Sequence, residues 1–289
     1  MVANPHCEWT MPRPYVAPSL EQIAADLQWI LQSPALLTQA FNPLFITDFL
    51  PSLPQADEAA WSELAEQARA LLVANPSHRL GRYYETLNRF LMNQASEVAL
   101  LACNHQIFDG KRTVGEFDFI YRSAKPAIAA VHREIAVKLY LGLPDATGQT
   151  TMGRWIGPNV KDRLGKKVNR LLTHQLRMSE TSFGQQALKQ LGLGQPAIEA
   201  WVQGYLFYPF SKPCNPPKEA STDHLRGWWM QLRQLEAFIT QSSLTHCCFV
   251  ELPRLRWLSA ARVATHDPSL LHSTVVHAYC EERLNRYPA

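Results

Sequence analysis

The chain of 289 residues has no long apolar run and few charges for its size. No stretch approaches the ~18 consecutive apolar residues that a membrane span requires, so we expect no membrane partner. Charged residues make up 18% and apolar residues 46% of the chain, which excludes an intrinsically disordered protein. The first 19 residues lack the apolar centre of a signal peptide. These absences predict a folded cytoplasmic protein.

Several common site motifs are also missing. The six cysteines form no Cys-x-x-Cys pair and lack the density of a disulfide framework, so we interpret them as reduced thiols. His105, His132 and His174 do not have the spacing of a zinc site. Gly192-Leu-Gly194 lacks the following glycine of a dinucleotide loop, and no Gly-x-Ser-x-Gly elbow occurs. We therefore expect no zinc and no nucleotide cofactor.

Positive charge is concentrated in the middle of the chain. Residues 111–177 contain 13 Lys or Arg against 5 Asp or Glu, a local charge of +8. The whole chain carries +3, so the remainder carries −5. Such a basic segment suits a phosphate-binding surface. A solvated helix face accounts for the same charges, and charge alone does not decide between the two.

Hydrophobic periodicity predicts helices first and strands afterwards. Apolar residues at helical spacing predict one helix capped by Ser19, a second from about Glu58 to Ala74 and a third capped by Ser77. The period then changes to two, which predicts strands over 98–108, 114–122 and 128–141, with turns at 109–110 and 123–127. Beyond these we expect a basic helix over 157–179, a short helix after Pro196, a strand over 205–210, a Trp-rich helix over 224–239, and strands over 246–252 and 254–263.

This order of elements predicts an α/β fold in which helices flank a mixed sheet that contains an antiparallel meander. No internal repeat or low-complexity linker divides the chain. We therefore expect a helical lead-in over residues 1–76, an α/β core over 77–180 and an α/β extension over 181–289 that packs on the core.

Two of the predicted strands carry charged groups on one face. On the first strand Glu116 and Asp118 share a face, and the opposite face carries Phe117, Phe119 and Tyr121. The polar face of the later strand consists of His132, Glu134, Ala136 and Lys138. Carboxylates directly opposed on adjacent strands repel by about 0.2–1 kcal/mol per pair, a cost that a lysine or a divalent cation would remove. The solvent side of an ordinary sheet would carry the same residue types, so both interpretations stay open.

Longer motifs lie between about residues 75 and 260. They are Gly81-Arg-Tyr-Tyr-Glu85, Gly115-Glu-Phe-Asp-Phe119, His132-Arg-Glu-Ile-Ala-Val-Lys-Leu-Tyr140, Gly157-Pro-Asn159, Asp162-Arg-Leu164, His174-Gln-Leu176, Gly204-Tyr-Leu-Phe-Tyr-Pro209 and Leu225-Arg-Gly-Trp-Trp229. On these motifs the chain resembles a bacterial family catalogued as domain of unknown function 1853, whose core is similar to the PD-(D/E)XK nuclease superfamily. The resemblance implies a restriction-endonuclease-like fold and a Mg²⁺-dependent nuclease that acts on nucleic acid.

The same resemblance assigns roles to individual residues. Asp118 matches the acid of the first strand, Lys138 the motif lysine, and Glu85 a glutamate on the preceding helix. The acid expected two residues before the lysine is replaced by Ala136. Glu134 stands two residues further back, roughly 7 Å along the strand, and would substitute for it.

The implied mechanism is metal-assisted phosphodiester hydrolysis. Asp118, Glu134 and Glu85 would hold Mg²⁺, which lowers the pKa of a bound water, and Lys138 would orient that water. The residues implied to contact the nucleic acid are Lys166, Lys167, Arg170 and Gln175. These would bind the phosphate backbone and would not read base sequence.

Two other functions stay open. Ala136 at the motif position favours a non-catalytic module that binds nucleic acid or protein on a degenerate nuclease fold. A structural or scaffold protein that uses exposed aromatic residues near Trp228 is a third possibility. Trp228 and Trp229 would also suit base stacking, and the alternative for them is a place in the hydrophobic core. His132 is interpreted as a hydrogen-bonded neighbour of the carboxylates, with a direct catalytic role as the alternative.

Overall fold

A computed structural model describes residues 15–38, 57–96, 98–123, 130–158 and 160–286. Most of the turn expected at 123–127 lies outside these ranges. The helices are α1 (Leu20–Gln32), α2 (Glu58–Ala74), α3 (Leu80–Gln94), α4 (Leu164–Arg170), α5 (Ser182–Gln190), α6 (Leu235–Gln241) and α7 (Ser273–Arg286). The strands are β1 (Val98–Asp109), β2 (Arg112–Ser123), β3 (Val131–Gly142), β4 (Trp155–Ile156), β5 (Ala197–Pro209), β6 (Leu225–Trp229), β7 (Cys248–Phe249) and β8 (Leu271–His272). Within the described ranges, every helix is too short or too polar to cross a membrane.

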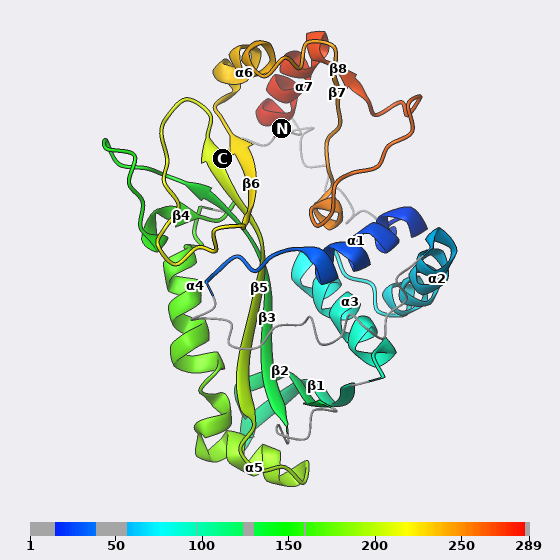
Figure 1. Cartoon of the computed structure of the whole chain (residues 1–289), viewed down its shortest axis with the longest axis vertical. Coiled ribbons are helices and arrows are strands. Elements are labelled where there is room, and N and C mark those ends of the chain that lie inside the picture. Colours follow the sequence, from blue (N-terminus) through cyan, green and yellow to red (C-terminus); the bar gives the residue numbers. More distant parts are fainter. Residues whose placement is uncertain (1–14, 39–56, 97, 124–129, 159, 287–289) are drawn as a thin grey trace, which may run out of the picture.

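The centre of the molecule is a six-stranded mixed sheet, which confirms the predicted α/β class. Its order is β1-β2-β3-β5-β6, and β4 pairs with the end of β3. The pairs β1–β2 and β2–β3 are antiparallel, whereas β3–β5 and β5–β6 are parallel. Helices α1, α2 and α3 cover one face of the long strands β3 and β5, and α4 covers the other (Figure 1). Strands β3 and β5 thus form a buried middle layer.

The first half of the chain folds close to its local sequence signals. The Ser19 hydroxyl accepts a hydrogen bond from the backbone N–H of Gln22, as expected of a helix cap. The second helix has the predicted bounds. Ser77 does not cap the third helix, because Arg79 occupies the N-cap position and the Ser77 hydroxyl accepts the Arg79 N–H instead.

The second half departs from the prediction. The basic helix begins only at Leu164 and passes into a π-helical turn, Leu171–Gln175. The short helix expected after Pro196 is the start of β5. Residues 225–229 of the expected Trp-rich helix form β6, because their backbone pairs with β5 and Gly227 leaves room for the Phe207 ring. The strand expected over 254–263 is instead a 3₁₀ turn followed by a loop. The strand expected over 246–252 is shorter and forms β7. Helix α7 was not predicted.

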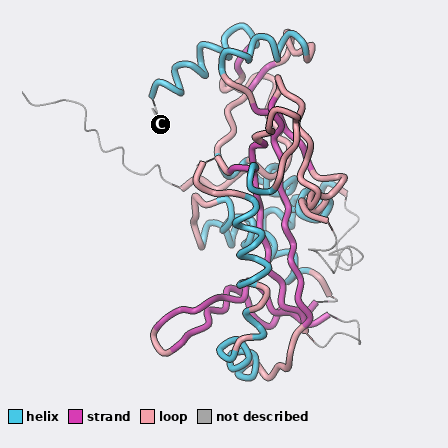
Figure 2. The backbone as a smooth tube through the Cα atoms, turned by 90° about the vertical axis from the view of Figure 1, so that its left-hand side faces the viewer, coloured by secondary structure: helices cyan, strands magenta, loops and turns pink. Residues whose placement is uncertain are grey.

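The hairpin of β1 and β2 extends beyond the rest of the sheet. Its two strands pair over most of their length, but β2 pairs with β3 only at residues 119–121. Figure 2 shows the hairpin projecting from the body of the molecule. Ile107, Phe117 and Ile120 of the hairpin pack in one hydrophobic cluster with Met178 and Leu188. The separation of β2 from β3 leaves a gap in the sheet between α3 and α4.

Gly204 in β5 occupies a position that suits glycine alone. Its φ of +132° lies in the left-handed region, and a Cβ there would lie 1.8 Å from the backbone oxygen of Lys138, the residue paired with it on β3. We expect Gly204→Ala to lower the free energy of unfolding by about 2–4 kcal/mol, measured by urea denaturation. The control is Gly194→Ala, where a Cβ would meet no atom within 4 Å. Equal effects of the two substitutions would contradict this prediction.

Candidate active site at the gap between two strands

The site begins where β2 separates from β3. The backbone pairing of β2 with β3 covers only residues 119–121 of β2. From Asp118 toward the hairpin turn, hydrogen bonds from side chains connect the two strands instead. Asp118 Oδ2 accepts the backbone N–H of Ile135 at 3.0 Å, and Glu134 Oε1 accepts the backbone N–H of Asp118 at 3.3 Å. The two carboxyl groups are therefore held together by hydrogen bonds to the backbone of the opposite strand.

The separation also changes which side chains of β2 share a face. The prediction that Phe117, Phe119 and Tyr121 form one core surface is wrong. Phe119 and Tyr121 pack in the core beneath α1–α3, whereas Phe117 packs with Ile120 in the cluster near α5. The simple alternation of a strand is lost where β2 leaves its neighbour, and this places Asp118 at the gap.

Glu134 is fully buried, so the solvent-facing interpretation of this strand face is excluded for it. Oε1 also lies 2.9 Å from His132 Nε2, and Oε2 accepts a hydrogen bond of 2.7 Å from Gln175 Nε2. Burial raises the pKa of Glu134 to about 7, although its hydrogen bonds oppose this shift. Both oxygens of Glu134 are thus engaged with protein groups.

His132 acts as a support for Glu134. Its side chain is fully buried, and burial lowers its pKa to about 4, so the imidazole is neutral near pH 7. Its ring packs edge-on against Phe117 at 4.6 Å, and its Nδ1 has no hydrogen-bond partner. A neutral imidazole in this position donates Nε2–H to the carboxylate of Glu134.

A small cavity of about 160 Å³ opens beside these carboxyl groups. Asp118 from β2, Glu85 from α3 and Lys138 from β3 line it together with Ala136. Burial, followed by the charge of Glu134, raises the pKa of Asp118 to about 8. Burial and then the charge of Asp118 raise the pKa of Glu85 as well. The cavity therefore holds carboxyl groups that resist ionisation in the absence of a further cation.

Lys138 faces the same cavity from the middle of β3. Burial, followed by the charge of Lys167, lowers the pKa of its amine to about 8. Glu85 and Asp162 partly offset this shift. An amine with a pKa close to neutral pH is suited to accept or donate a proton.

A second, more open cavity of about 470 Å³ adjoins the first. The two share Glu85, Asp118 and Gln175 as lining residues. The second cavity adds side chains from α3, the β1–β2 hairpin and the end of the α4 region, namely Arg82, Thr113, Glu116, Arg170 and His174. Together the cavities form a cleft in which basic groups stand on both sides of the carboxyl groups.

The residues implied to bind substrate are only partly brought to this cleft. Lys167 lines the small cavity, and Arg170 lines the open one. Gln175 lines both and reaches Glu134 because the π-helical turn ends at this residue. Lys166 is exposed and lines neither cavity.

Sequence reasoning gave no role to two further side chains that line the cleft, Arg82 and His174. Arg82 forms a salt bridge of 3.1 Å with Glu85, and the spacing of three residues on one helix was its available signal. His174 belongs to the motif His174-Gln-Leu176 and has no zinc-site spacing, and the structure places it in the lining of the open cavity. Its neighbour Gln175 was the only signal for its position.

The carboxyl groups were also expected to hold a metal ion. Among the described residues, no three His, Cys, Asp or Glu side chains are grouped in the way a metal cage requires. Mg²⁺ commonly uses only one or two carboxylates and completes its shell with water and substrate phosphates. Asp118 and Glu85 supply two carboxylates at one cavity, so the residues present fit a Mg²⁺ of this kind.

The buried carboxyl groups predict that stability falls as the pH rises through neutrality. In the fold, the pKa values are about 8 for Asp118 and about 7 for Glu134, against references of 3.8 and 4.5. The stability contributed by these retained protons is fully present below the reference values and is lost as the pH rises through the folded ones. His132, lowered from 6.5 to about 4, acts in the opposite sense and only below about pH 6.5.

We therefore expect the unfolding temperature, measured by scanning calorimetry, to fall between about pH 6.5 and pH 8. Lys138, with its pKa lowered from 10.5 to about 8, acts above this window. Asp118→Asn should reduce the fall, because it removes the group with the higher folded pKa of the two carboxyls. An unfolding temperature that rises over this interval would contradict the assignment.

Comparison with known proteins shows the family of the chain, but it finds no similar curated protein or solved structure. The sequence model of the family described as Domain of unknown function (DUF1853) matches residues 25–289. No curated protein and no solved structure matches the chain.

Proposed function

Because the chain belongs to the family described as Domain of unknown function (DUF1853), whose description states no activity, we propose a function from the cleft itself. The proposed function is Mg²⁺-dependent hydrolysis of phosphodiester bonds in nucleic acid. The observation that carries it is the convergence of Asp118, Glu85 and Lys138 on one cavity at the gap between β2 and β3. The proposal includes a restriction-endonuclease-like core, because an acid on one strand and a lysine on the next are the arrangement implied by the PD-(D/E)XK resemblance.

The state of the carboxyl groups supports a cation in this cavity. Asp118, Glu134 and Glu85 all have raised pKa values, so their ionised forms are penalised where they stand. A divalent cation would offset that penalty. We assign Asp118 and Glu85 as the ligands, and we assign Glu134 to holding Asp118, since both of its oxygens already accept hydrogen bonds.

When bound, Mg²⁺ would offset the charge on the phosphate and lower the pKa of a water. The protein groups around it supply the remaining chemistry. Lys138 would orient the attacking water, and its neutral amine would accept the proton that this water loses, because the pKa of about 8 lies close to neutral pH. Lys167 and Arg170 would bind phosphates on the α4 side, and Arg82 would do so on the α3 side.

The test is a cleavage assay of the full chain with 5′-labelled single-stranded DNA, duplex DNA and RNA, in Mg²⁺, Mn²⁺ or EDTA. We expect cleavage with metal and none with EDTA. Lys138→Met should reduce the rate by about 10²–10⁴-fold, the usual contribution of a general acid or base. The matched control is the exposed Lys189→Met, which should cleave like the wild type. Cleavage in EDTA, or full activity of Lys138→Met, would refute the proposal.

Ala136 favours one other function, a non-catalytic nucleic-acid-binding module. It lines the small cavity at the position where the motif places an acid, and a methyl group cannot bind a metal. On this alternative the protein binds nucleic acid in a salt-dependent manner without metal and cleaves none of the three substrates. Binding without cleavage in the same assay would therefore support it over the nuclease.

A further inference from the structure

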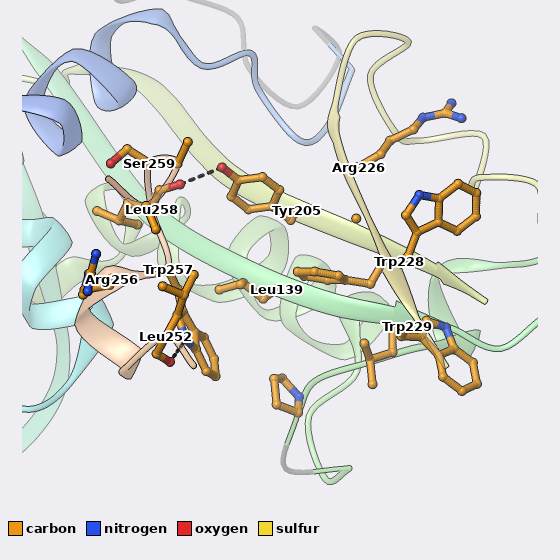
Figure 3. Close-up of a pocket in the computed structure, with 16 residues that line it drawn as sticks. Leu139, Tyr205, Arg226, Trp228, Trp229, Leu252, Arg256, Trp257, Leu258 and Ser259 are labelled. Atoms are coloured by element: carbon orange, nitrogen blue, oxygen red, sulfur yellow. Dashed lines mark hydrogen bonds between the residues drawn. The ribbon is translucent and has the colours of Figure 1, made fainter. Parts of the chain in front are cut away.

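The face of the sheet that carries the proposed nuclease cleft extends to the edge strand β6. Neighbouring residues of a strand point to opposite faces, and residues paired across strands point to the same face. Arg226 pairs with Leu206 and Trp228 with Tyr208, and both partners belong to the hydrophobic cluster that includes α4. Arg226 and Trp228 therefore point to the α4 face, away from the apolar groove lined by Leu139 (Figure 3).

Trp228 presents an aromatic ring to solvent on this face. The sequence left open whether Trp228 and Trp229 stack on bases or belong to the core, and the structure divides them. Trp229 is half-buried, and its Nε1 donates a hydrogen bond of 3.1 Å to the backbone oxygen of Gly142. Trp228 is 59% exposed, although its partner Tyr208 is buried. A ring exposed to this extent is available to stack on a second flat ring.

Positive charge lies beside this ring. A pocket of about 530 Å³ is lined by Lys212, Arg226 and Trp228, and no acidic side chain lines it. The Arg226 guanidinium lies over the Tyr208 ring, 5.0 Å from its centre. In the part of the chain that the structure describes, neither cation forms a salt bridge with a carboxylate. The pocket thus combines a surface for a flat ring with two cations that suit phosphate groups.

The pocket lies close enough to the cleft for one nucleic-acid strand to reach both. Lys138 of the cleft pairs with Gly204 on β5, and Tyr208, the partner of Trp228, lies four residues further along β5. Four residues of strand and two steps between strands correspond to about 16 Å. A stacked strand covers this distance with about five nucleotides, and an extended strand with fewer. Helix α4, which carries the exposed Lys166, runs along the same face (Figure 1).

We propose that the pocket of Arg226 and Trp228 binds a single-stranded segment of the nucleic acid that occupies the cleft. A base of this segment would stack on Trp228, and Arg226 and Lys212 would bind its phosphates. A base within a duplex is already stacked on its neighbours, so an unpaired strand is the form that fits an exposed ring. The inference rests on the proposed function for the identity of the ligand, but this binding step requires neither metal nor cleavage.

The test is a binding assay by fluorescence anisotropy on the full chain in EDTA. The probes are labelled oligothymidylate and oligouridylate of about 12 nucleotides, which exceeds the distance between the two sites, and a blunt DNA duplex of the same length. Trp228→Ala removes the ring, Trp228→Phe keeps a smaller ring, and Arg226→Gln removes one charge. The matched controls are Val73→Ala and Arg69→Gln, two exposed residues of α2, which covers the opposite face. Circular dichroism verifies that each variant is folded.

We expect Trp228→Ala to bind the single strands at least about 5-fold more weakly than the wild type, the low end of the contribution of one stacked base. Trp228→Phe should regain part of this loss, and Trp228→Ala should bind the duplex like the wild type. Arg226→Gln should make the dependence of log affinity on log salt shallower by about 0.7, the value for one phosphate contact of a single strand. Both controls should bind like the wild type.

The proposal is wrong if the wild type binds neither single strand, if Trp228→Ala binds them like Val73→Ala, or if Trp228→Ala weakens duplex binding as much as single-strand binding. The cleavage assay gives a separate result. Binding that depends on Trp228, without cleavage in Mg²⁺, would refute hydrolysis and support the pocket. Cleavage by a protein whose binding does not depend on Trp228 would refute the pocket alone.

Discussion

Asp118→Asn should abolish cleavage of nucleic acid without lowering the stability of the protein. We expect a loss of at least about 100-fold in the cleavage rate, because the substitution removes a carboxylate assigned to hold Mg²⁺. The Asn oxygen can still accept the Ile135 N–H, which Asp118 Oδ2 accepts at 3.0 Å. Burial raises the pKa of Asp118 to about 8, so a neutral side chain of the same shape removes a destabilising ionisation. The unfolding temperature should be equal to or higher than that of the wild type.

Calorimetric titration separates a metal-binding role of Asp118 from a purely structural one. Micromolar-to-millimolar binding of Mg²⁺ or Mn²⁺ to the wild type should disappear in Asp118→Asn. The control is Asp109→Asn at the exposed tip of the β1–β2 hairpin, which should retain both metal binding and cleavage. A variant at Asp118 that unfolds more easily and still cleaves would assign this carboxyl to structure alone.

Arg133→Met should be among the most destabilising single substitutions in the protein. Arg133 and Glu199 form a two-point ion pair of 2.6 and 2.9 Å on the face of the sheet beneath α1–α3, and their side chains are 2% and 0% exposed. The Tyr121 hydroxyl donates a third hydrogen bond, of 3.0 Å, to Glu199. Removing Arg133 leaves a buried carboxylate without its counter-charge, and we expect a loss of about 3–5 kcal/mol in the free energy of unfolding.

A double substitution tests whether the unpaired charge causes this loss. Arg133→Met/Glu199→Leu should recover most of the stability, because well-packed apolar residues often replace a buried ion pair at little cost. The control is Arg177→Met, which breaks an exposed pair with Glu180 whose side chains are 60% and 42% exposed. It should cost less than about 1 kcal/mol. If Arg133→Met costs no more than the control, the pair does not stabilise the sheet.

The sequence by itself determined the elements that depend on local signals. The bounds of α2 and the Ser19 cap follow from residue spacing and from side chains three residues apart. The three strands of the meander follow from alternation and from the Asp109-Gly110 turn. Asp118, Lys138 and Glu85 stand in motifs that resemble the nuclease superfamily, and the structure brings these three to one cavity.

Other features were decided only by contacts between distant parts of the chain. The local sequence of residues 225–229 predicts a helix, but in the fold these residues form a strand because their backbone pairs with the edge of β5. Glu199 gave no signal in the sequence, because its partner Arg133 is 66 residues away and faces the opposite side of the sheet from Glu134. One hydrogen-bond donor to Glu134 is Gln175, which is 41 residues away on the π-helical turn.

The position of the cleft also depends on tertiary structure. Alternation along β2 predicts which side chains share a face, but it does not predict where β2 stops pairing with β3. Next to that point, Phe117 and Ile120 pack with Met178 and Leu188, residues about 60 positions further along the chain. The sequence therefore determined which groups are available for chemistry, and the tertiary structure decided their burial, partners and protonation. The physical reason is that desolvation and hydrogen bonding depend on neighbours that folding brings together from distant positions.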